Sequence, residues 1–464
     1  MKNNTIYIVL FIYAIIATLT ILFFDGTGGA GDSIQHYLFA KFAPLHPQLF
    51  FNHWAKPVYV LLVSPFAQFG FIGVKIFNAI VSLLSIFFTF KIAQKLNLKN
   101  AIMGAVILIF SPLYFVLTFS GLTEPLFALF ISISLYAILK HKYIAACLIV
   151  SFLPFIRSEG LIIIGVFAFY FLLKKKWKLI PLLLFGNVVY SIAGFFVYND
   201  FLWVFNKIPY AHLSSTYGSG RLFHFVDQLI YIVGVPIYIL FWFGVISIFW
   251  KSIKKKITLE LQILVFLGFL SFFIAHTLFW YLGIFNSMGL KRVLIGVMPL
   301  ISIISLFGFN FITEEIFKNK RIPKLITQGL LITYIVIFPF SKNPAAINWE
   351  KDFKLSNDQQ SAIQVADYIT QNIGIDHRFV FAHPYLSEVL KIDHFDCNKR
   401  VELTQDFLNN IKSGDIIIWE NWFCVAERGV KREHLDNISE LNNIYNLSVK
   451  KKGREILYSV YICE

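Results

Sequence analysis

The chain has 464 residues, of which 57% are hydrophobic and 15% are charged. Together with a mean hydropathy of +0.67, this composition excludes a water-soluble globular protein and indicates an α-helical polytopic membrane protein. The formal net charge of +14 does not indicate binding to nucleic acid. The basic residues form short clusters between apolar segments, where cytoplasmic loops and anionic lipid headgroups explain them.

Apolar segments follow one another along most of the chain. The first, 5–24, follows a single lysine and lacks a small-residue cleavage pattern, so we expect a retained anchor rather than a signal peptide. Because about 20 apolar residues cross the hydrocarbon core as a helix, we predict about eleven crossings. They are 5–24, 73–91, 101–118, 124–139, 143–156, 160–173, 179–197, 229–250, 261–283, 292–311 and 325–340. The short segment 57–71, which contains Pro65, predicts an interfacial or re-entrant helix.

Clusters of basic residues predict the orientation. They fall at every second connection, as the positive-inside rule requires of cytoplasmic loops. The clusters are Lys91, Lys95 and Lys99; Lys140 and Lys142; Lys174, Lys175, Lys176 and Lys178; Lys251, Lys254, Lys255 and Lys256; and Lys318, Lys320, Arg321 and Lys324. We therefore expect a multi-pass protein of the inner (plasma) membrane with Met1 in the cytoplasm. The predicted outer segments are 25–56, 119–123, 157–159, 198–228, 284–291 and the tail from Ser341.

The composition becomes more polar after Phe340, and this change divides the chain into 1–340 and 341–464. The stretches "RFVFAHPYL" and "GDIIIWENW" predict strands, and "SNDQQSAIQVADYITQNI" predicts a helix. The tail is thus expected to be a small α/β domain outside the membrane. Its three cysteines allow one disulfide with one thiol left over.

The first outer loop, 25–56, carries the stretch "GDSIQHYLFAKF", which predicts an amphipathic helix that begins near Asp32. On this helix Asp32 and His36 are four residues apart and share a face. Asp32 is then either an N-terminal cap or a functional carboxylate.

The end of the same loop favours the functional interpretation, because His46, His53 and Lys56 follow within a short distance. Histidines and Asp32 can together bind a metal, but scattered histidines are more typical of hydrogen-bonding or interfacial positions, so we expect no metal. The stretch "GTGGAG" follows a membrane segment rather than a strand and lacks the lysine of a nucleotide-binding loop, which indicates a flexible, closely packed hinge.

Two further outer stretches contain acidic and basic residues. In "FSGLTEPLF", Glu124 lies at the predicted start of a helix, where the helix dipole favours a carboxylate and where an acceptor hydroxyl can also be held. In "LPFIRSEG", Arg157 and Glu159 lie between two short apolar segments and form either a local ion pair or part of a water-filled site.

More cations lie near the predicted outer surface, namely Arg221, Lys291 and Arg292. A guanidinium group matches phosphate oxygens in its hydrogen-bonding geometry. Together with Arg157, these cations predict a site for an anionic lipid headgroup.

The order of these features resembles the GT-C superfamily of integral-membrane glycosyltransferases, which includes protein O-mannosyltransferases, aminoarabinose transferases and GPI mannosyltransferases. One span precedes a long outer loop that opens with "GD" and closes on "HWAKPVY", and many spans and an outer tail follow. "SGLTEPLF" looks like the Thr-Glu-Pro segment of GPI-type mannosyltransferases, and "FIRSEG" looks like their Arg-x-Glu-Gly-type element. "GLKRVLIGVMPL" is similar to the start of a late helix in the family. The likeness covers about residues 1 to 340.

The resemblance implies that Asp32 is the catalytic base and that Arg292 contacts the lipid phosphate. It gives substrate-site roles to Glu124, Arg157 and Glu159. We also expect substrate contacts from His36, His53, Lys56 and Arg221. Some relatives carry two adjacent acids in this loop, whereas Ser33 follows Asp32 here, which argues against a metal; no other cofactor is implied.

The expected location restricts the sugar donor, because sugar nucleotides stay in the cytoplasm while the candidate residues face outward. The sequence therefore predicts a polyprenyl-phosphate-linked donor of a hexose or pentose and a lipid, glycan or protein acceptor. A transporter or flippase for a lipid-linked glycan is the alternative, although transporters usually place polar groups at the midplane. A non-enzymatic envelope scaffold with the tail as its binding module is a third interpretation.

Overall fold

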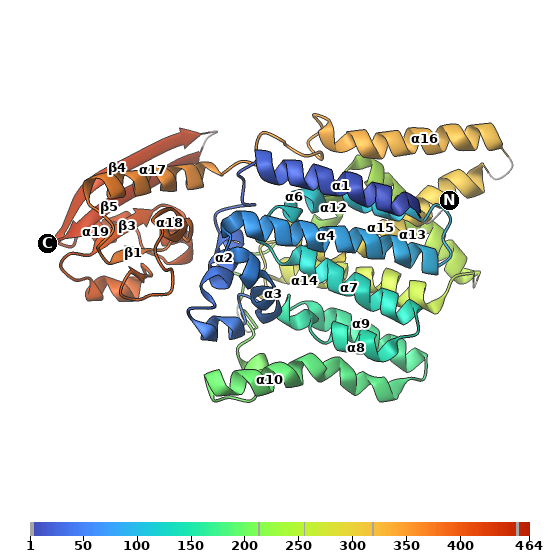
Figure 1. The fold of residues 1–464 in the computed structure, drawn as a ribbon, viewed down its shortest axis with the longest axis horizontal. Helices are drawn as coiled ribbons and strands as arrows, with labels where there is room; N and C mark the ends of the chain where they lie inside the picture. The colour runs from blue at the N-terminus through green and yellow to red at the C-terminus, as the bar shows by residue number, and fades with distance from the viewer. Residues whose placement is uncertain (1–3, 212–213, 255, 318–319, 452–453) are drawn as a thin grey trace.

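The computed structural model describes the chain except residues 1–3, 212–213, 255, 318–319 and 452–453. Met1 and the predicted basic-cluster residues Lys255 and Lys318 thus lie outside the described residues. The chain forms a bundle of helices and, after Phe340, a smaller part that contains a β-sheet (Figure 1).

The helices of the bundle follow the apolar segments of the sequence. They are α1 (Asn4–Phe23), α2 (Asp32–Phe42), α3 (Pro57–Ala67), α4 (Gly70–Lys95), α5 (Ile102–Ile109), α6 (Pro112–Thr118), α7 (Glu124–Leu139), α8 (Tyr143–Val150), α9 (Gly160–Leu173), α10 (Phe185–Tyr198), α11 (Trp203–Asn206), α12 (His224–Val233), α13 (Val235–Ile253), α14 (Gly268–Leu282), α15 (Met298–Asn310) and α16 (Arg321–Ile337). Tighter or wider helical turns extend several of them, including η3 (Trp177–Leu184), η4 (Leu261–Leu267), η5 (Lys291–Val297) and η6 (Phe311–Ile316).

Seven helical stretches among the described residues are long and apolar enough to cross a membrane. They are Asn4–Phe23, Gly70–Lys95, Trp177–Tyr198, Val235–Ile253, Leu261–Leu282, Lys291–Ile316 and Arg321–Phe340. Shorter apolar helices occupy Pro57–Ala67, Glu124–Leu139, Tyr143–Phe155, Gly160–Leu173 and His224–Val233. The chain is a multi-pass membrane protein.

Two of the predicted crossings are not single helices. The segment 101–118 is divided into α5 and α6 at Ser111, because Pro112 lacks the N–H group that would continue the first helix. The segment 229–250 begins in α12 and continues in α13 after Gly234, whose φ of +80° ends the first helix. The second interruption leaves Val235–Ile253 long enough to cross, so only the first lowers the number of long stretches. The other three predicted crossings that are not among the seven, 124–139, 143–156 and 160–173, form the shorter apolar helices.

The stretch Lys291–Ile316 lies at the centre of the bundle, and 94% of the residues in its most apolar part are buried. In its middle, α15 packs closely against α13 through two glycines. A Cβ atom at Gly244 would lie 1.9 Å from the carbonyl oxygen of Ile304, and one at Gly308 would lie 1.8 Å from that of Leu240. Small residues therefore allow the two backbones to touch, as is common between membrane helices.

The tail contains a five-stranded mixed sheet with strand order β2-β1-β3-β5-β4. Its elements are α17 (Asn357–Asn372), β1 (Phe379–Phe381), α18 (Tyr385–Val389), β2 (Arg400–Val401), β3 (Ile416–Glu420), α19 (Arg432–Asp436), β4 (Leu441–Lys451) and β5 (Arg454–Cys463). β1 is parallel to β2 and β3, and β5 is antiparallel to β3 and β4. All four cysteines of the chain are free thiols, with Cys397 exposed. The predicted mixture of helices and strands is confirmed.

The first loop of the bundle joins the tail to the membrane part. Helix α2 lies on the side of the bundle that faces the sheet (Figure 1), and its Lys41 forms an ion pair of 2.7 Å with Glu388. The backbone N–H of Gly26 donates to the carbonyl oxygen of Phe353 over 2.7 Å. A Cβ atom at Gly26 would lie 2.3 Å from the carbonyl carbon of Phe353. The glycine-rich stretch thus packs its backbone directly against the backbone of the tail.

Candidate active site

Asp32 is the first residue of α2, and Gly31 before it provides no side-chain cap. The Asp32 carboxylate does not cap the helix; its Oδ2 atom accepts a hydrogen bond from Nη2 of Arg292. The Asp32 side chain stays 47% exposed. Asp32 is therefore a charged, reachable carboxylate at a helix start, where the dipole favours it.

The environment of Asp32 keeps its carboxyl group ionised. Burial opposes ionisation, but the positive charge of Arg292 and its hydrogen bond outweigh burial, and they hold the pKa of Asp32 below its usual value. At neutral pH the side chain is thus a carboxylate that can accept a proton.

A chain of ion pairs runs inward from Arg292. Its Nε atom lies 3.8 Å from Oε1 of Glu124, and the same oxygen lies 2.7 Å from Nη1 of Arg157. Arg157 reaches Oε1 of Glu159 with Nη2 at 2.8 Å, and Nε2 of His276 follows at 3.6 Å. The predicted ion pair of Arg157 and Glu159 is therefore present and belongs to a larger network. Pairing of this kind makes buried charges tolerable.

Several polar atoms of this network have no hydrogen-bond partner among the described residues. They include Oε2 of Glu124, Nε of Arg157 and Nε2 of His276. The Glu124 side chain is only 1% exposed, and buried polar groups are normally satisfied by protein, water or a ligand. These atoms are free to bind water or another polar group.

Lys56 adds a further cation to the cluster. Its backbone has a left-handed φ of +70°. Its Nζ atom donates to Oγ of Ser158 over 2.8 Å, and Ser158 lies between Arg157 and Glu159 in the sequence. Burial lowers the pKa of Lys56 to about 8, although the negative charge of Glu159 opposes this shift. Lys56 is thus mainly protonated at neutral pH.

The histidines of the first loop support its shape. The His36 ring stacks on the Trp54 ring, with 4.9 Å between the ring centres. Its Nδ1 atom lies 3.2 Å from the carbonyl oxygen of Ala55. His53 contacts the carbonyl oxygen of Val204 through Nε2 at 3.1 Å. Burial lowers the pKa of each of the two histidines to about 4, so both rings are neutral at pH 7. Within the part of the chain that the structure describes, no group of three or more His, Cys, Asp or Glu side chains could hold a metal ion.

Arg221 does not join the cluster. Its side chain is 83% exposed and forms an ion pair of 3.1 Å with Asp227. The structure thus brings together Asp32, Glu124, Arg157, Glu159 and Arg292, with Lys56 beside them, and leaves Arg221 at the surface.

The site residues expected from the sequence did not include His276, and of the tail only its aromatic stretches were expected to contact the acceptor. His276 is a buried ionisable residue in the apolar helix α14, a signal that marks functional positions in membrane segments. Phe423 comes from the tail, and a Cβ atom at Gly31 would lie 3.7 Å from its ring. Tyr217, from the loop before α12, donates to Glu427 over 2.7 Å. No local pattern predicts such contacts, because they depend on how the tail packs on the bundle.

This chain is similar to known proteins in its structure. No protein-family model matches the sequence, and no curated protein matches it. Two crystal structures of ArnT from Cupriavidus metallidurans, a GT-C glycosyltransferase, align over 99% of this chain and 98% of theirs. The structure with bound undecaprenyl phosphate has a TM-score of 0.63 at 10% identity, and the apo structure has 0.61 at 11%. The chain has the GT-C fold. The predicted fold class is thereby confirmed, and the GT-C fold includes the tail as well as residues 1 to 340.

Proposed function

We propose that this protein transfers a sugar from a polyprenyl-phosphate carrier to an acceptor on the outer side of the inner membrane. The observation that carries the proposal is the ionised Asp32 carboxylate beside the cations Arg292, Arg157 and Lys56. The GT-C fold supports it, because ArnT with this fold binds undecaprenyl phosphate.

In the proposed reaction, the Asp32 carboxylate accepts the proton of an acceptor hydroxyl while that oxygen attacks the anomeric carbon of the sugar. The bond between the anomeric carbon and the phosphate oxygen breaks, and the electron pair leaves with the polyprenyl phosphate. Negative charge therefore grows on the phosphate, and Arg292 and Lys56 stabilise it more strongly in the transition state than in the bound donor.

The inner network has a positioning role in this proposal. Glu124 and Glu159 hold the Arg157 guanidinium from two sides, at 2.7 Å and 2.8 Å, and its Nε atom has no hydrogen-bond partner among the described residues. The acceptor is a lipid, a glycan or a protein, and the sugar is a hexose or a pentose.

The test replaces Asp32 by Asn, which keeps the shape and removes the charge. Purified protein in liposomes is given undecaprenyl-phosphate-linked hexoses and pentoses with candidate acceptors, and release of undecaprenyl phosphate is measured. We expect D32N to lower the rate by about 10²- to 10⁴-fold, as for loss of a general base. The exposed Asp25 in the same loop provides the matched control, because D25N should keep the wild-type rate.

Donor binding is tested separately with undecaprenyl phosphate itself. R292Q and K56Q should weaken its binding, whereas D32N should not. Wild-type turnover by D32N would refute the base assignment. Movement of a lipid-linked glycan across the liposome membrane without any sugar transfer would favour the transporter.

A further inference from the structure

A second group of cations lies at the end of the bundle opposite the candidate active site. Helices α7 and α9 begin beside Glu124 and Glu159 and end at Leu139 and Leu173. With 16 and 14 residues, they are about 24 Å and 21 Å long. The turns that follow them are therefore separated from the active site by most of the thickness of a bilayer.

The two turns have the same backbone design. His141 and Lys175 have φ values of +58° and +57°. The N–H groups of Lys142 and Lys176 then bond back to the carbonyl oxygens of Ala137 and Phe171. This arrangement is the Schellman motif that ends a helix, and it fixes the direction in which each turn presents its basic residues.

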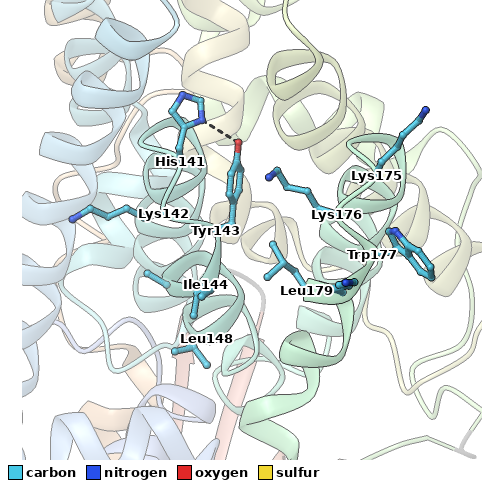
Figure 2. A pocket seen from close by; sticks show the side chains of 11 residues that line it. His141, Lys142, Tyr143, Ile144, Leu148, Lys175, Lys176, Trp177 and Leu179 are labelled. Atoms are coloured by element: carbon cyan, nitrogen blue, oxygen red, sulfur yellow. Dashed lines mark hydrogen bonds between the residues drawn. The ribbon is translucent and has the colours of Figure 1, made fainter.

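A groove of about 810 Å³ separates the two turns. Its basic lining consists of His141, Lys142, Lys175, Lys176 and Lys178, and no acidic residue lines it. Figure 2 shows His141 bonded to the hydroxyl of Tyr143, and Lys176 pointing toward the same tyrosine from the other turn. The Lys176 ammonium lies 4.5 Å from the Tyr143 ring centre.

Among the described residues, no carboxylate forms an ion pair with Lys142, Lys175, Lys176 or Lys178 of the groove. Glu260 forms its ion pair with Lys174, next to the groove, at 2.8 Å, and it accepts a hydrogen bond from the Tyr170 hydroxyl over 2.9 Å. Lys176 points into the groove, whereas Lys142 and Lys175 extend outward from its two rims (Figure 2). Like charges gathered around one groove repel, and an anion bound there reduces this repulsion. The groove is therefore complementary to a negatively charged group.

The rest of the lining indicates what carries that group. Leu148 and Leu179 form an apolar part of the groove, and Trp177 and Ile144 beside them are 65% and 60% exposed. Tryptophan next to lysine is typical of the level of lipid headgroups. We propose that the groove binds an anionic phospholipid of the cytoplasmic leaflet, with the phosphate between the two turns and an acyl chain along the leucines. This site is independent of the proposed sugar transfer.

The test uses native mass spectrometry of the full-length protein with added phosphatidylglycerol or phosphatidylcholine. Wild-type protein should bind phosphatidylglycerol and not phosphatidylcholine. Each lysine near an anionic lipid changes affinity roughly fivefold, so K175Q/K176Q should weaken binding by about 30-fold. The variant K175R/K176R keeps the charges and should retain binding.

The matched control is K91Q/K254Q. These two lysines belong to other basic clusters, and like Lys176 they lie over aromatic rings, those of Phe87 and Trp250. The control should bind phosphatidylglycerol as the wild type does. Equal binding by wild type and K175Q/K176Q, equal loss in the control, or displacement of the lipid by millimolar inorganic phosphate would each overturn the proposal.

Discussion

At the scale of single residues, the contact between Asp32 and Arg292 sets the charge of the candidate base. Because the pKa of Asp32 is lowered, the carboxylate form persists at neutral pH and is lost as the pH falls through this lowered value. R292Q removes the charge that lowers the pKa, so the acid limb of the rate should move to higher pH by about one unit or more. This shift is measured from the pH dependence of undecaprenyl phosphate release by the wild type and R292Q.

The neighbouring Lys291 provides the control for this prediction. Its ammonium lies 6.0 Å from the Tyr231 ring centre, and its charge is not among those that lower the pKa of Asp32. K291Q should therefore leave the acid limb in place. An acid limb that R292Q does not move would show that the titrating group is not Asp32.

Arg157 is the residue whose loss should cost the most stability. It lies between Glu124 and Glu159, and removal of one partner from a buried ion pair typically costs about 3–5 kcal/mol. R157M should lower the unfolding temperature in detergent strongly, because two carboxylates lose their partner. The double variant R157M/E124Q should recover part of the loss, since it removes the most buried of the two charges. No recovery would mean that Arg157 acts through packing rather than charge.

At the scale of elements, the position of α2 depends on contact with the turn before α7. The N–H of Gly121 donates to Oγ of Ser33 over 2.7 Å, and a Cβ atom at Gly121 would lie 2.3 Å from the carbonyl oxygen of Ser33. G121A should therefore displace the start of α2 with Asp32, and we expect a loss of about 10²-fold in transfer, as for a 1 Å misplacement of a catalytic group.

Gly165 offers the matched control for G121A. It lies inside α9, and an added Cβ atom would meet nothing within 4 Å. G165A should keep the transfer rate and raise the stability of the helix by up to about 1 kcal/mol. Equal rates for G121A and wild type would show that α2 does not depend on this contact.

The sequence predicted the elements better than the contacts between them. Hydrophobic stretches predicted most membrane helices, since burial in lipid requires them to be apolar. The segments 101–118 and 229–250 were wrong as single helices, because hydropathy does not register a break at Ser111 or Gly234. The pairing of Asp32 with Arg292 spans 260 positions, and only a resemblance to a family, not a local pattern, suggested that both belong to one site.

At the scale of the whole molecule, the tail holds α2 through Glu388. This carboxylate accepts from the Tyr37 hydroxyl at 3.0 Å and pairs with Lys41 at 2.7 Å. Both ionic partners keep about 30% of their side-chain surface exposed, and solvent screening limits such a pair to about 1 kcal/mol. E388A should therefore speed hydrogen exchange in α2 by about fivefold with little change in the unfolding temperature. E433A, at an exposed position of α19, should leave exchange in α2 unchanged.

The orientation of the molecule can be tested with its own cysteine. Cys397 is exposed in the tail, while Cys147, Cys424 and Cys463 are buried. Helix α4 has 26 residues and is about 39 Å long. Its start lies beside the end of α1, where Lys75 donates to the carbonyl oxygen of Phe24, and its last residue, Lys95, lies at the other end.

A membrane-impermeant maleimide should label wild-type protein in intact spheroplasts and should not label C397S. In the variant C397S/K95C it should react only after the membrane is permeabilised, because Lys95 belongs to a basic cluster that the positive-inside rule places in the cytoplasm. The reverse pattern would put Asp32 on the side where sugar nucleotides are made. The argument for a lipid-linked donor would then lose its premise, while the GT-C fold and the ion-pair network around Arg157 would be unaffected.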